Sequence, residues 1–344
     1  MNILIVKLSA VGDVIHVLPS LSALREAFPD AHISWVVEES AADLLRGHPQ
    51  CDRVLISGRK RWIANLRHNR RIGGTFTEIR SFLANLRDRR YDIAIDFHGL
   101  FKSAVIMGFA KADRKIGYRS MQELSQLFYN ETVHEDMTKH AVLRYLDFIA
   151  YLGIPVSEPR FVIPGGPEEK ARVDRMLAEA GIKREQKFVA VSPVALWKTK
   201  LWYNDRFALL GDRITDELAL PVVFTGGSDA AGVVHDIRRR MSAGSVDLAG
   251  KTSLRELARL YERAALVIST DSGPMHLAAA VGTPTVAIFG PTDPARTGPF
   301  GDGHHVIRTG IECSPCFRKV CDSGACMAGI TIDAVFDAVR ERLE

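Results

Sequence analysis

The sequence predicts an α/β protein made of two doubly wound parallel sheets. Short, nearly continuous apolar segments alternate with segments whose apolar residues have helical spacing, which is typical of a parallel sheet covered on both faces. This alternation begins at residue 2 and begins again after residue 185. Residues 155–167 are rich in proline and glycine, as expected of a linker, and 344 residues exceed the usual size of one domain.

The first series opens with an apolar strand over Asn2–Leu8. A helix is expected over Leu18–Phe28, and further strands over His32–Val37 and Tyr91–Phe97. The second series predicts four strands, in chain order Phe188–Ser192, Pro221–Thr225, Leu266–Ser269 and Thr285–Phe289. Ligands bind beyond the carboxyl ends of the strands in such sheets, so we expect both sets of strand ends to face a cleft between the domains.

The predicted domain bounds follow from these two series. We expect a first domain over residues 1–157 and a linker with a helix over 158–185. The second domain is expected over 186–330, and a C-terminal helix, 331–344, is expected to pack back on the first domain.

The overall composition is that of an ordinary soluble protein, with 47% hydrophobic residues, 25% charged residues and a net charge of +4. No apolar run approaches the ~18 residues that a membrane span requires. The N-terminus lacks the basic start and the long apolar core of a secretory signal. We therefore expect a cytoplasmic protein without a transmembrane segment.

Four of the five cysteines lie close together in the sequence, at Cys313, Cys316, Cys321 and Cys326. Structural zinc sites usually have two separated CxxC pairs or paired cysteines and histidines, whereas this stretch has one CxxC and two single cysteines. We favour ordinary loop or packing cysteines over a structural metal, and we predict no metal site.

The turn after the first strand, residues 9–13 (SAVGD), is the first candidate for chemistry. A strand–glycine–helix turn presents backbone N–H groups beside the positive end of a helix, which favours an anion. The turn matches neither GxGxxG nor the P-loop pattern, so no dinucleotide or Walker-type site is indicated. It ends in Asp13, which is either a helix-capping residue or a general base.

Two candidates follow strands of the second series. Residues 269–276 (STDSGPMH) combine small residues with a helix start, whose N–H groups can bind a diphosphate; the alternative is a simple capped helix. Lys200, within residues 197–202 (WKTKLW), is placed to neutralise charge on a leaving phosphate, unless this is only a surface loop.

The basic segment over Arg53–Arg71 is the last candidate. No Asp or Glu interrupts it before Glu78, and its cations are Arg53, Arg59, Lys60, Arg61, Arg67, Arg70 and Arg71. An anionic partner explains this pattern, and a solvated loop is the alternative. No nucleic-acid-binding module accompanies the segment, so we do not expect nucleic acid as the partner.

Together these segments resemble the heptosyltransferases of glycosyltransferase family nine. The resemblance spans nearly the whole chain, and its most specific motifs are residues 3–21 (ILIVKLSAVGDVIHVLPSL), 99–104 (GLFKSA), 248–258 (LAGKTSLRELA), 269–280 (STDSGPMHLAAA) and 289–294 (FGPTDP). It implies a GT-B enzyme that inverts the anomeric centre and uses neither a metal nor a cofactor. The branch that adds the first heptose of the lipopolysaccharide inner core is the most similar.

The resemblance also implies substrates and a location. The donor is expected to be ADP-L-glycero-D-manno-heptose and the acceptor Kdo-lipid A. The enzyme is expected to work as a monomer, peripheral to the cytoplasmic face of the inner membrane. The alternatives are a second-heptose transferase, another family-nine transferase with a different nucleotide sugar or acceptor, a nucleotide-sugar epimerase of GT-B shape, or a non-catalytic binding module.

Site residues carried over from the family fall into three groups. The catalytic residues are Asp13, as base, and Lys200. The donor-binding residues are Gly12, Ser192, Asp229, Thr270, Asp271, Ser272, Gly273 and His276. The acceptor-binding residues are Lys7, Lys60, Arg61, Trp62, Lys102 and Arg144. Asp229 is included because alanines follow it in the loop at 226–231, where the family has a ribose-binding glutamate.

Overall fold

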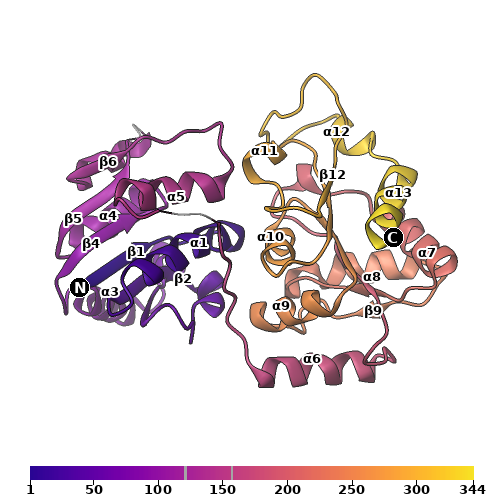
Figure 1. Ribbon diagram of the computed structural model, residues 1–344, viewed down its shortest axis with the longest axis horizontal. Helices are drawn as coiled ribbons and strands as arrows, with labels where there is room; N and C mark the ends of the chain where they lie inside the picture. Colours follow the sequence, from indigo (N-terminus) through magenta and orange to yellow (C-terminus); the bar gives the residue numbers. More distant parts are fainter. Residues whose placement is uncertain (120–121, 156–157) are drawn as a thin grey trace. The chain divides into compact units, whose positions relative to one another are not determined.

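The computed structural model describes residues 1–119, 122–155 and 158–344, and it divides into two compact units, Met1–Pro164 and Gly165–Glu344. Each unit is a parallel sheet with helices packed on it (Figure 1). No helix within the described ranges is long and apolar enough to cross a bilayer.

The first unit contains a six-stranded sheet in the order β3-β2-β1-β4-β5-β6, in which all paired strands are parallel. Its strands are β1 (Asn2–Val6), β2 (His32–Glu38), β3 (Arg53–Ser57), β4 (Tyr91–Asp96), β5 (Ala112–Tyr118) and β6 (Glu131–Val133). Its helices are α1 (Val11–Ala27), α2 (Arg59–Arg67), α3 (Ile72–Leu86), α4 (Phe101–Phe109) and α5 (Ala141–Tyr151), with 3-10 helices η1 (Glu39–Leu44) and η2 (Gln122–Phe128).

The second unit repeats this arrangement with the sheet order β12-β11-β10-β7-β8-β9. Its strands are β7 (Val189–Ser192), β8 (Val222–Phe224), β9 (Val246–Asp247), β10 (Leu266–Thr270), β11 (Thr285–Ile288) and β12 (His305–Ile307). Its helices are α6 (Pro167–Glu179), α7 (Asn204–Leu218), α8 (Ala231–Arg240), α9 (Leu254–Arg263), α10 (Gly273–Ala280), α11 (Pro294–Thr297), α12 (Ala325–Ala328) and α13 (Ile332–Leu343), with η3 (Lys198–Lys200) and η4 (Ser228–Ala230).

The direction of strand order reverses between β1 and β4 in the first sheet, and between β7 and β10 in the second. In the first sheet Val6 pairs with Asp96, and in the second Ser192 pairs with Ser269, so the carboxyl ends of the two central strands are level in each unit. Such switch points are where doubly wound sheets bind ligands. The predicted fold class is confirmed.

The predicted helix over Leu18–Phe28 begins earlier, at Val11. Residues 14–24 of α1 are all buried, including Pro19, so this stretch of the helix has no exposed face. A helix that is buried on every side shows no amphipathic period, so only the later turns of α1 were predicted from the sequence.

The domain bounds differ from those predicted. The units meet at Pro164 and Gly165, whereas the predicted boundary falls beside residues 156–157, which are outside the described part of the chain. Helix α6 lies in the predicted linker but packs on α9, and its Val173 and Leu177 are buried. It therefore belongs to the second unit.

The C-terminal helix also belongs to the second unit, where it lies beside α7 (Figure 1). Val335, Phe336 and Val339 are spaced at helical intervals and are buried in one cluster with Phe207 and Ile214 of α7. The apolar stripe of α13 is thus used in the core of its own unit, and the docking of residues 331–344 on the first domain stays a prediction.

Candidate active site

Asp13 stands at the start of α1, directly beyond the carboxyl end of β1. Its Oδ2 accepts a hydrogen bond from the backbone N–H of Ala10 at 3.0 Å, so it does cap the helix. The side chain is half-buried. A carboxylate has two oxygens that can each accept more than one hydrogen bond, so this single contact orients the group without exhausting it. The capping role and the role of a general base are compatible.

Lys7 lies behind this turn rather than on the surface. It is 3% exposed, and its Nζ donates to the carbonyl of Phe97 at 3.0 Å and to the hydroxyl of Tyr145 at 2.6 Å. Burial lowers the pKa of Lys7, while the nearby Asp13 and Asp96 carboxylates oppose that shift. The ammonium group of Lys7 therefore has partners inside the domain, and its contact with an acceptor stays a prediction.

Asp96 ends β4 and organises the loop that follows it. Its carboxylate accepts from the backbone N–H groups of His98 at 2.8 Å and Gly99 at 3.2 Å, and from the Tyr129 hydroxyl at 2.7 Å. Burial raises the pKa of Asp96, although these hydrogen bonds counter it. The contacts hold His98 and the start of α4 beside the end of β1.

The end of β2 carries a buried carboxylate, Glu38, that binds two cations of the basic segment. Arg59 and Lys60 lie 2.7 and 3.0 Å from its oxygens. Burial favours the neutral form of Glu38, but the hydrogen bonds from these two cations outweigh it and lower the pKa. Burial, together with the charges of Arg59 and Lys60, lowers the pKa of the half-buried Lys102.

The basic segment is thus ordered structure with internal partners rather than a solvated loop. It forms β3 and α2, and Arg61 pairs with both Glu39 and Glu78. Trp62 donates from Nε1 to Glu78 at 2.8 Å and packs edge-on against Phe82. The cations in the first half of the segment are paired although the segment has no acidic residue, because their carboxylates come from elsewhere in the sequence.

Arg144 is likewise buried and paired inside the first unit. It lies in α5, is 7% exposed, and pairs with Glu135 at 2.7 Å. The guanidinium is thus held by a carboxylate in the interior, and its contact with an acceptor stays a prediction.

In the second unit, Lys200 and Asp271 form a buried ion pair. Lys200 Nζ lies 2.6 Å from Oδ2 of Asp271, and these side chains are 16% and 5% exposed. Thr292 Oγ1 donates to the same oxygen at 2.5 Å, and the ammonium lies 4.5 Å from the centre of the Trp197 ring. The Asp271 carboxylate therefore holds Lys200 in one position, and the part of Asp271 in donor binding stays a prediction.

Helix α10 starts beside this pair, with Gly273 as its first residue. Thr270 donates to the carbonyl of Val194 at 3.0 Å, which ties the end of β10 to the loop after β7. Ser272 Oγ lies 3.2 Å from Ser269 Oγ. Ser272 and Gly273 are half-buried, so the positive end of the helix is accessible to an anion.

A family model described as glycosyltransferase family 9 (heptosyltransferase) matches residues 79–326. This chain belongs to glycosyltransferase family 9. Lipopolysaccharide heptosyltransferase 1 of Pseudomonas aeruginosa PAO1 is 31% identical over 330 residues, covering 93% of this chain and 87% of the relative. Lipopolysaccharide heptosyltransferase 1 of Escherichia coli K12 is 30% identical, with coverages of 91% and 95%.

Solved structures agree with this membership. The E. coli heptosyltransferase WaaC with ADP has a TM-score of 0.80 at 27% identity and covers 99% of this chain and 100% of its own. A glycosyl transferase family 9 structure from Veillonella parvula has a TM-score of 0.82 at 25% identity, with coverages of 99% and 97%. The protein is therefore a glycosyltransferase with the GT-B fold, as predicted.

The remaining predicted donor residues of the glycosyltransferase have varied surroundings. Ser192, at the end of β7, and His276, in the first turn of α10, are buried, whereas Asp229 is exposed in η4. Gly12 is buried in α1 of the first unit, next to Asp13. Their parts in donor binding stay predictions.

His98 of this glycosyltransferase is a further candidate that none of the sequence motifs indicated. Both ring nitrogens are buried and have no hydrogen-bond partner within the described part of the chain. Burial and the charges of Lys7, Lys102 and Arg59 lower the pKa of His98 to about 2. A neutral imidazole among cations can donate to an anion. Its position directly after a strand at the switch point was the sequence signal that could have found it.

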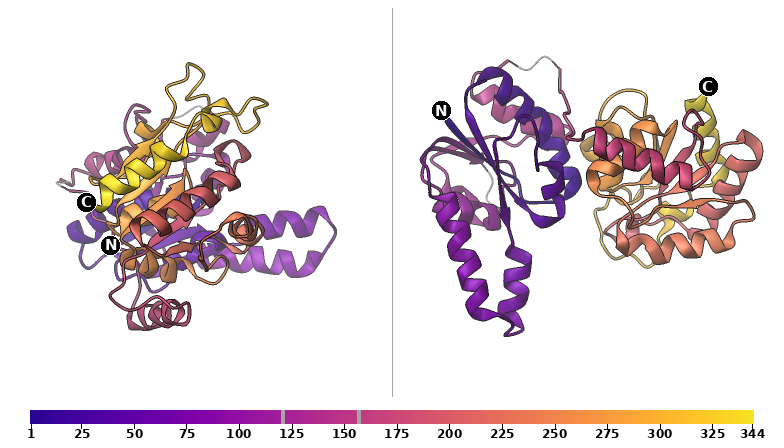
Figure 2. Two further views of the ribbon diagram at one scale, coloured as in Figure 1. Left: turned by 90° about the vertical axis from the view of Figure 1, so that its right-hand side faces the viewer. Right: turned by 90° about the horizontal axis from the view of Figure 1, so that it is seen from below.

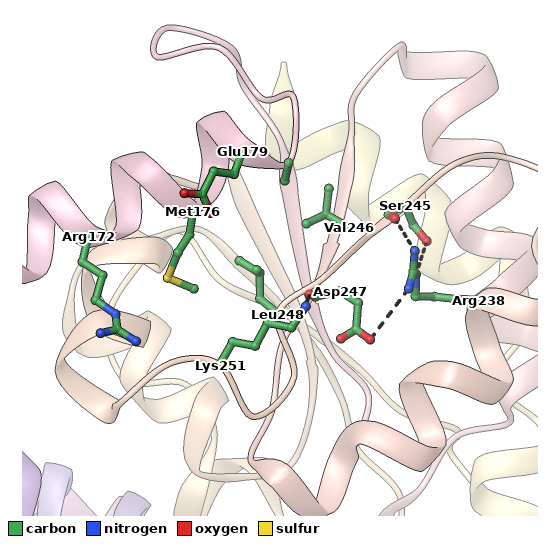
Figure 3. Close-up of a pocket in the computed structure, with 10 residues that line it drawn as sticks. Arg172, Met176, Glu179, Arg238, Ser245, Val246, Asp247, Leu248 and Lys251 are labelled. Atoms are coloured by element: carbon green, nitrogen blue, oxygen red, sulfur yellow. Dashed lines mark hydrogen bonds and ion pairs between the residues drawn. The ribbon is translucent and has the colours of Figure 1, made fainter.

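One pocket of the glycosyltransferase lies apart from the predicted residues. It is formed by α6, the end of α8 and the chain around β9 (Figure 3). Its Arg238 is held by Ser245 at 2.9 Å and by Asp247 at 3.7 Å. None of the predicted site residues lines it, so we do not treat it as the active site.

The cysteine-rich loop adjoins the Lys200 region. The Cys316 N–H donates to the carbonyl of Pro291 at 2.9 Å, and Thr199 donates to the carbonyl of Arg318 at 2.8 Å. All five cysteines are free. Over the described ranges, no group of three or more His, Cys, Asp or Glu side chains is arranged to hold a metal ion. The loop supports the segment that carries Lys200.

Proposed function

We propose that this enzyme transfers L-glycero-D-manno-heptose from ADP-heptose to Kdo-lipid A, with inversion and without a metal ion, during assembly of the lipopolysaccharide inner core. The observation that carries the proposal is the pair of switch-point sites: Asp13, oriented by its cap, in one unit, and Lys200 with Asp271 beside the start of α10 in the other. Full-length relatives named lipopolysaccharide heptosyltransferase 1 support the choice of heptose.

The chemistry follows from these groups. The acceptor hydroxyl gives its proton to the Asp13 carboxylate as its oxygen bonds to the anomeric carbon of the heptose. The bond between that carbon and the diphosphate oxygen breaks on the opposite face, so the configuration inverts and ADP leaves. Lys200 and the N–H groups at the start of α10 stabilise the charge that develops on the diphosphate.

The donor is proposed to bind in the second unit. The diphosphate accepts hydrogen bonds from the backbone N–H groups around Ser272 and Gly273, and Thr270 and His276 border that end of α10. Ser192 and Asp229 are proposed to contact the nucleoside side of the donor. A solved relative, WaaC, is described with ADP-2-deoxy-2-fluoro heptose, which supports this class of donor.

The acceptor is proposed to bind in the first unit. Lys102 has no ion pair in the described portion of the chain, and with His98 it offers donors for a sugar carboxylate. Lys60, Arg61 and Trp62 are proposed to border this site, with the two cations held by their carboxylate partners. Because the proposed acceptor is a membrane lipid, we propose that the enzyme works at the cytoplasmic face of the inner membrane. We also propose that it works as a monomer.

A second heptose transferase is the runner-up. Lipopolysaccharide heptosyltransferase 3 of E. coli K12 is 28% identical over 293 residues, which is close to the values for heptosyltransferase 1. Identity at this level separates the family from other families better than it separates acceptors within the family.

Mass spectrometry of the products tests the proposal. The purified enzyme is incubated with ADP-heptose and either Kdo-lipid A or an acceptor that already carries the first heptose. We expect one heptose to be added to Kdo-lipid A only, and the Asp13→Asn variant to add almost none. Transfer only to the heptosylated acceptor would replace the proposal with a second-heptose transferase.

A further inference from the structure

Helices α2 and α3 form a hairpin that extends away from the sheet of the first unit (Figure 2). The turn between them, residues 68–71, is exposed. On α3, the face with Thr75, Phe82 and Leu86 is buried, so the hairpin is anchored along one side only.

Another side of the hairpin, next to the buried one, carries large apolar side chains in contact with water. On α2, Ile63 and Leu66 are 52% and 37% exposed and lie one turn apart. On α3, Ile72 and Phe76 are 43% and 59% exposed and also lie one turn apart. Four large apolar side chains near the end of one hairpin form a surface that favours an apolar partner.

A shallow groove continues this surface along α3. It is lined by Phe76, Ile79, Arg80, Leu83, Ala84 and Arg87. Phe76, Ile79 and Leu83 recur at helical spacing, and Arg80 and Arg87 flank them. An apolar stripe bordered by arginines is typical of a helix that lies in a membrane interface.

Charge is distributed unequally along the hairpin. At its base, Arg59 and Arg61 are paired with carboxylates, as described above. Near its end, Arg67, Arg70 and Arg71 are exposed and form no ion pair with any residue that the structure describes. The positive charge beside the apolar side chains is therefore not ion-paired, although Arg71 interacts electrostatically with Glu78.

We infer that the end of this hairpin, with Ile63, Leu66, Ile72 and Phe76 between Arg67, Arg70 and Arg71, docks on an anionic lipid bilayer. Apolar side chains enter the boundary of the acyl chains, and arginines pair with headgroup phosphates. A second copy of the chain fits this surface poorly, because facing hairpins bring like charges together. Nucleic acid would leave the apolar side chains unused.

The inference deepens the proposed function, because a lipid-linked acceptor is presented at such a surface. It also accounts for the basic segment, whose first cations are paired with carboxylates while its last cations can bind an anionic membrane. The cations near the base hold α2 in place, and those near the end remain free for headgroups.

Vesicle flotation of the purified full-length chain tests the inference. The vesicles are phosphatidylcholine with or without phosphatidylglycerol, and no substrate is present. We expect binding only to the anionic vesicles, weakened by salt. Ile63→Ser with Phe76→Ser, and separately Arg67→Gln with Arg70→Gln and Arg71→Gln, should each lower the bound fraction at least about tenfold.

Matched controls come from the second unit. Leu209→Ser removes an apolar side chain that is 51% exposed, and Lys170→Gln with Arg175→Gln and Arg184→Gln removes three exposed cations. These variants should float like the unaltered protein. Thermal unfolding should be unchanged in every variant, because none of the substituted side chains is buried.

The outcomes separate this inference from the proposed function. Equal flotation of hairpin variants and controls, or no binding of the unaltered protein to anionic vesicles, overturns the docking surface. A dimer in light scattering that the apolar variant dissociates would assign the surface to a second copy instead. Vesicle binding by an enzyme that transfers no heptose to either acceptor would reject the proposed function and leave the docking surface intact.

Discussion

Lys200 Nζ lies 2.6 Å from Asp271 Oδ2, and Thr292 donates to the same carboxylate oxygen at 2.5 Å. The ammonium is thus held between the Asp271 carboxylate and the face of the Trp197 ring, beside the start of α10. Such a pair fixes one position of a flexible side chain, which is what a cation that must meet a departing diphosphate requires.

Asp271→Asn should lower kcat by about 10- to 100-fold while ADP binding, measured by calorimetry, changes little or becomes tighter, since a negative charge is removed. Lys200→Met should lower kcat by at least as much. The effects in the double variant should be less than additive, because both substitutions disrupt one unit. Fully additive losses would show that Asp271 acts independently of Lys200.

Asp13→Asn should lower kcat by about 10²–10⁴-fold with little loss of stability. The asparagine side-chain oxygen can still accept from the Ala10 N–H, so the cap survives while the base is lost. Asp13→Ala should lose the same activity and, in addition, about 0.5–2 kcal/mol of unfolding free energy. Steady-state kinetics measures the change in kcat, and chemical denaturation measures the change in unfolding free energy. Near-normal activity of the Asp13→Asn variant would show that Asp13 is only a helix cap.

His98 should make stability depend on pH. Its folded pKa, about 2, lies below the ordinary value of 6.5, so the unfolded chain takes up a proton that the folded chain refuses as the pH falls below 6.5. Stability should therefore fall between pH 6.5 and pH 4, by at most about 1.4 kcal/mol per pH unit from this residue. The unfolding free energy of the His98→Gln variant, measured by denaturation, should fall less steeply with decreasing pH than that of the unaltered protein. Parallel pH profiles of the two proteins would contradict the burial of a neutral imidazole.

Lys102→Ala should raise the acceptor KM more than Lys60→Ala. Lys60 is paired with Glu38 at 3.0 Å, whereas Lys102 lies among cations and near His98. Kinetics with a water-soluble Kdo-containing acceptor measure this without a membrane, and the KM for ADP-heptose should stay the same in both variants. A larger effect at Lys60 would move the acceptor site toward the hairpin.

Catalysis should survive treatment with EDTA. Lys200 and the start of α10 are proposed to stabilise the diphosphate that a divalent cation stabilises in other transferases. The measurement is the rate of ADP release before and after chelation, with circular dichroism to monitor the fold. Activity that is lost and then restored by Mg²⁺ alone would contradict the proposed roles.

The sequence by itself determined the alternation of strands and helices in both units. Continuous apolar segments such as those at 2–8 and 266–269 are local properties of the chain, and burial of both sheet faces requires them. It also determined that Asp13, Lys200 and the start of α10 follow strands, and parallel strands bring their carboxyl ends to one edge.

Only the tertiary structure decided which charges are free. Glu38 neutralises Arg59 and Lys60, Asp271 binds Lys200, and burial withdraws Lys7 from the surface. These partners come from distant parts of the chain, and the register of the strands brings them together. The energy of an ion depends on burial and on the groups around it, so composition and spacing along the sequence could not reveal it.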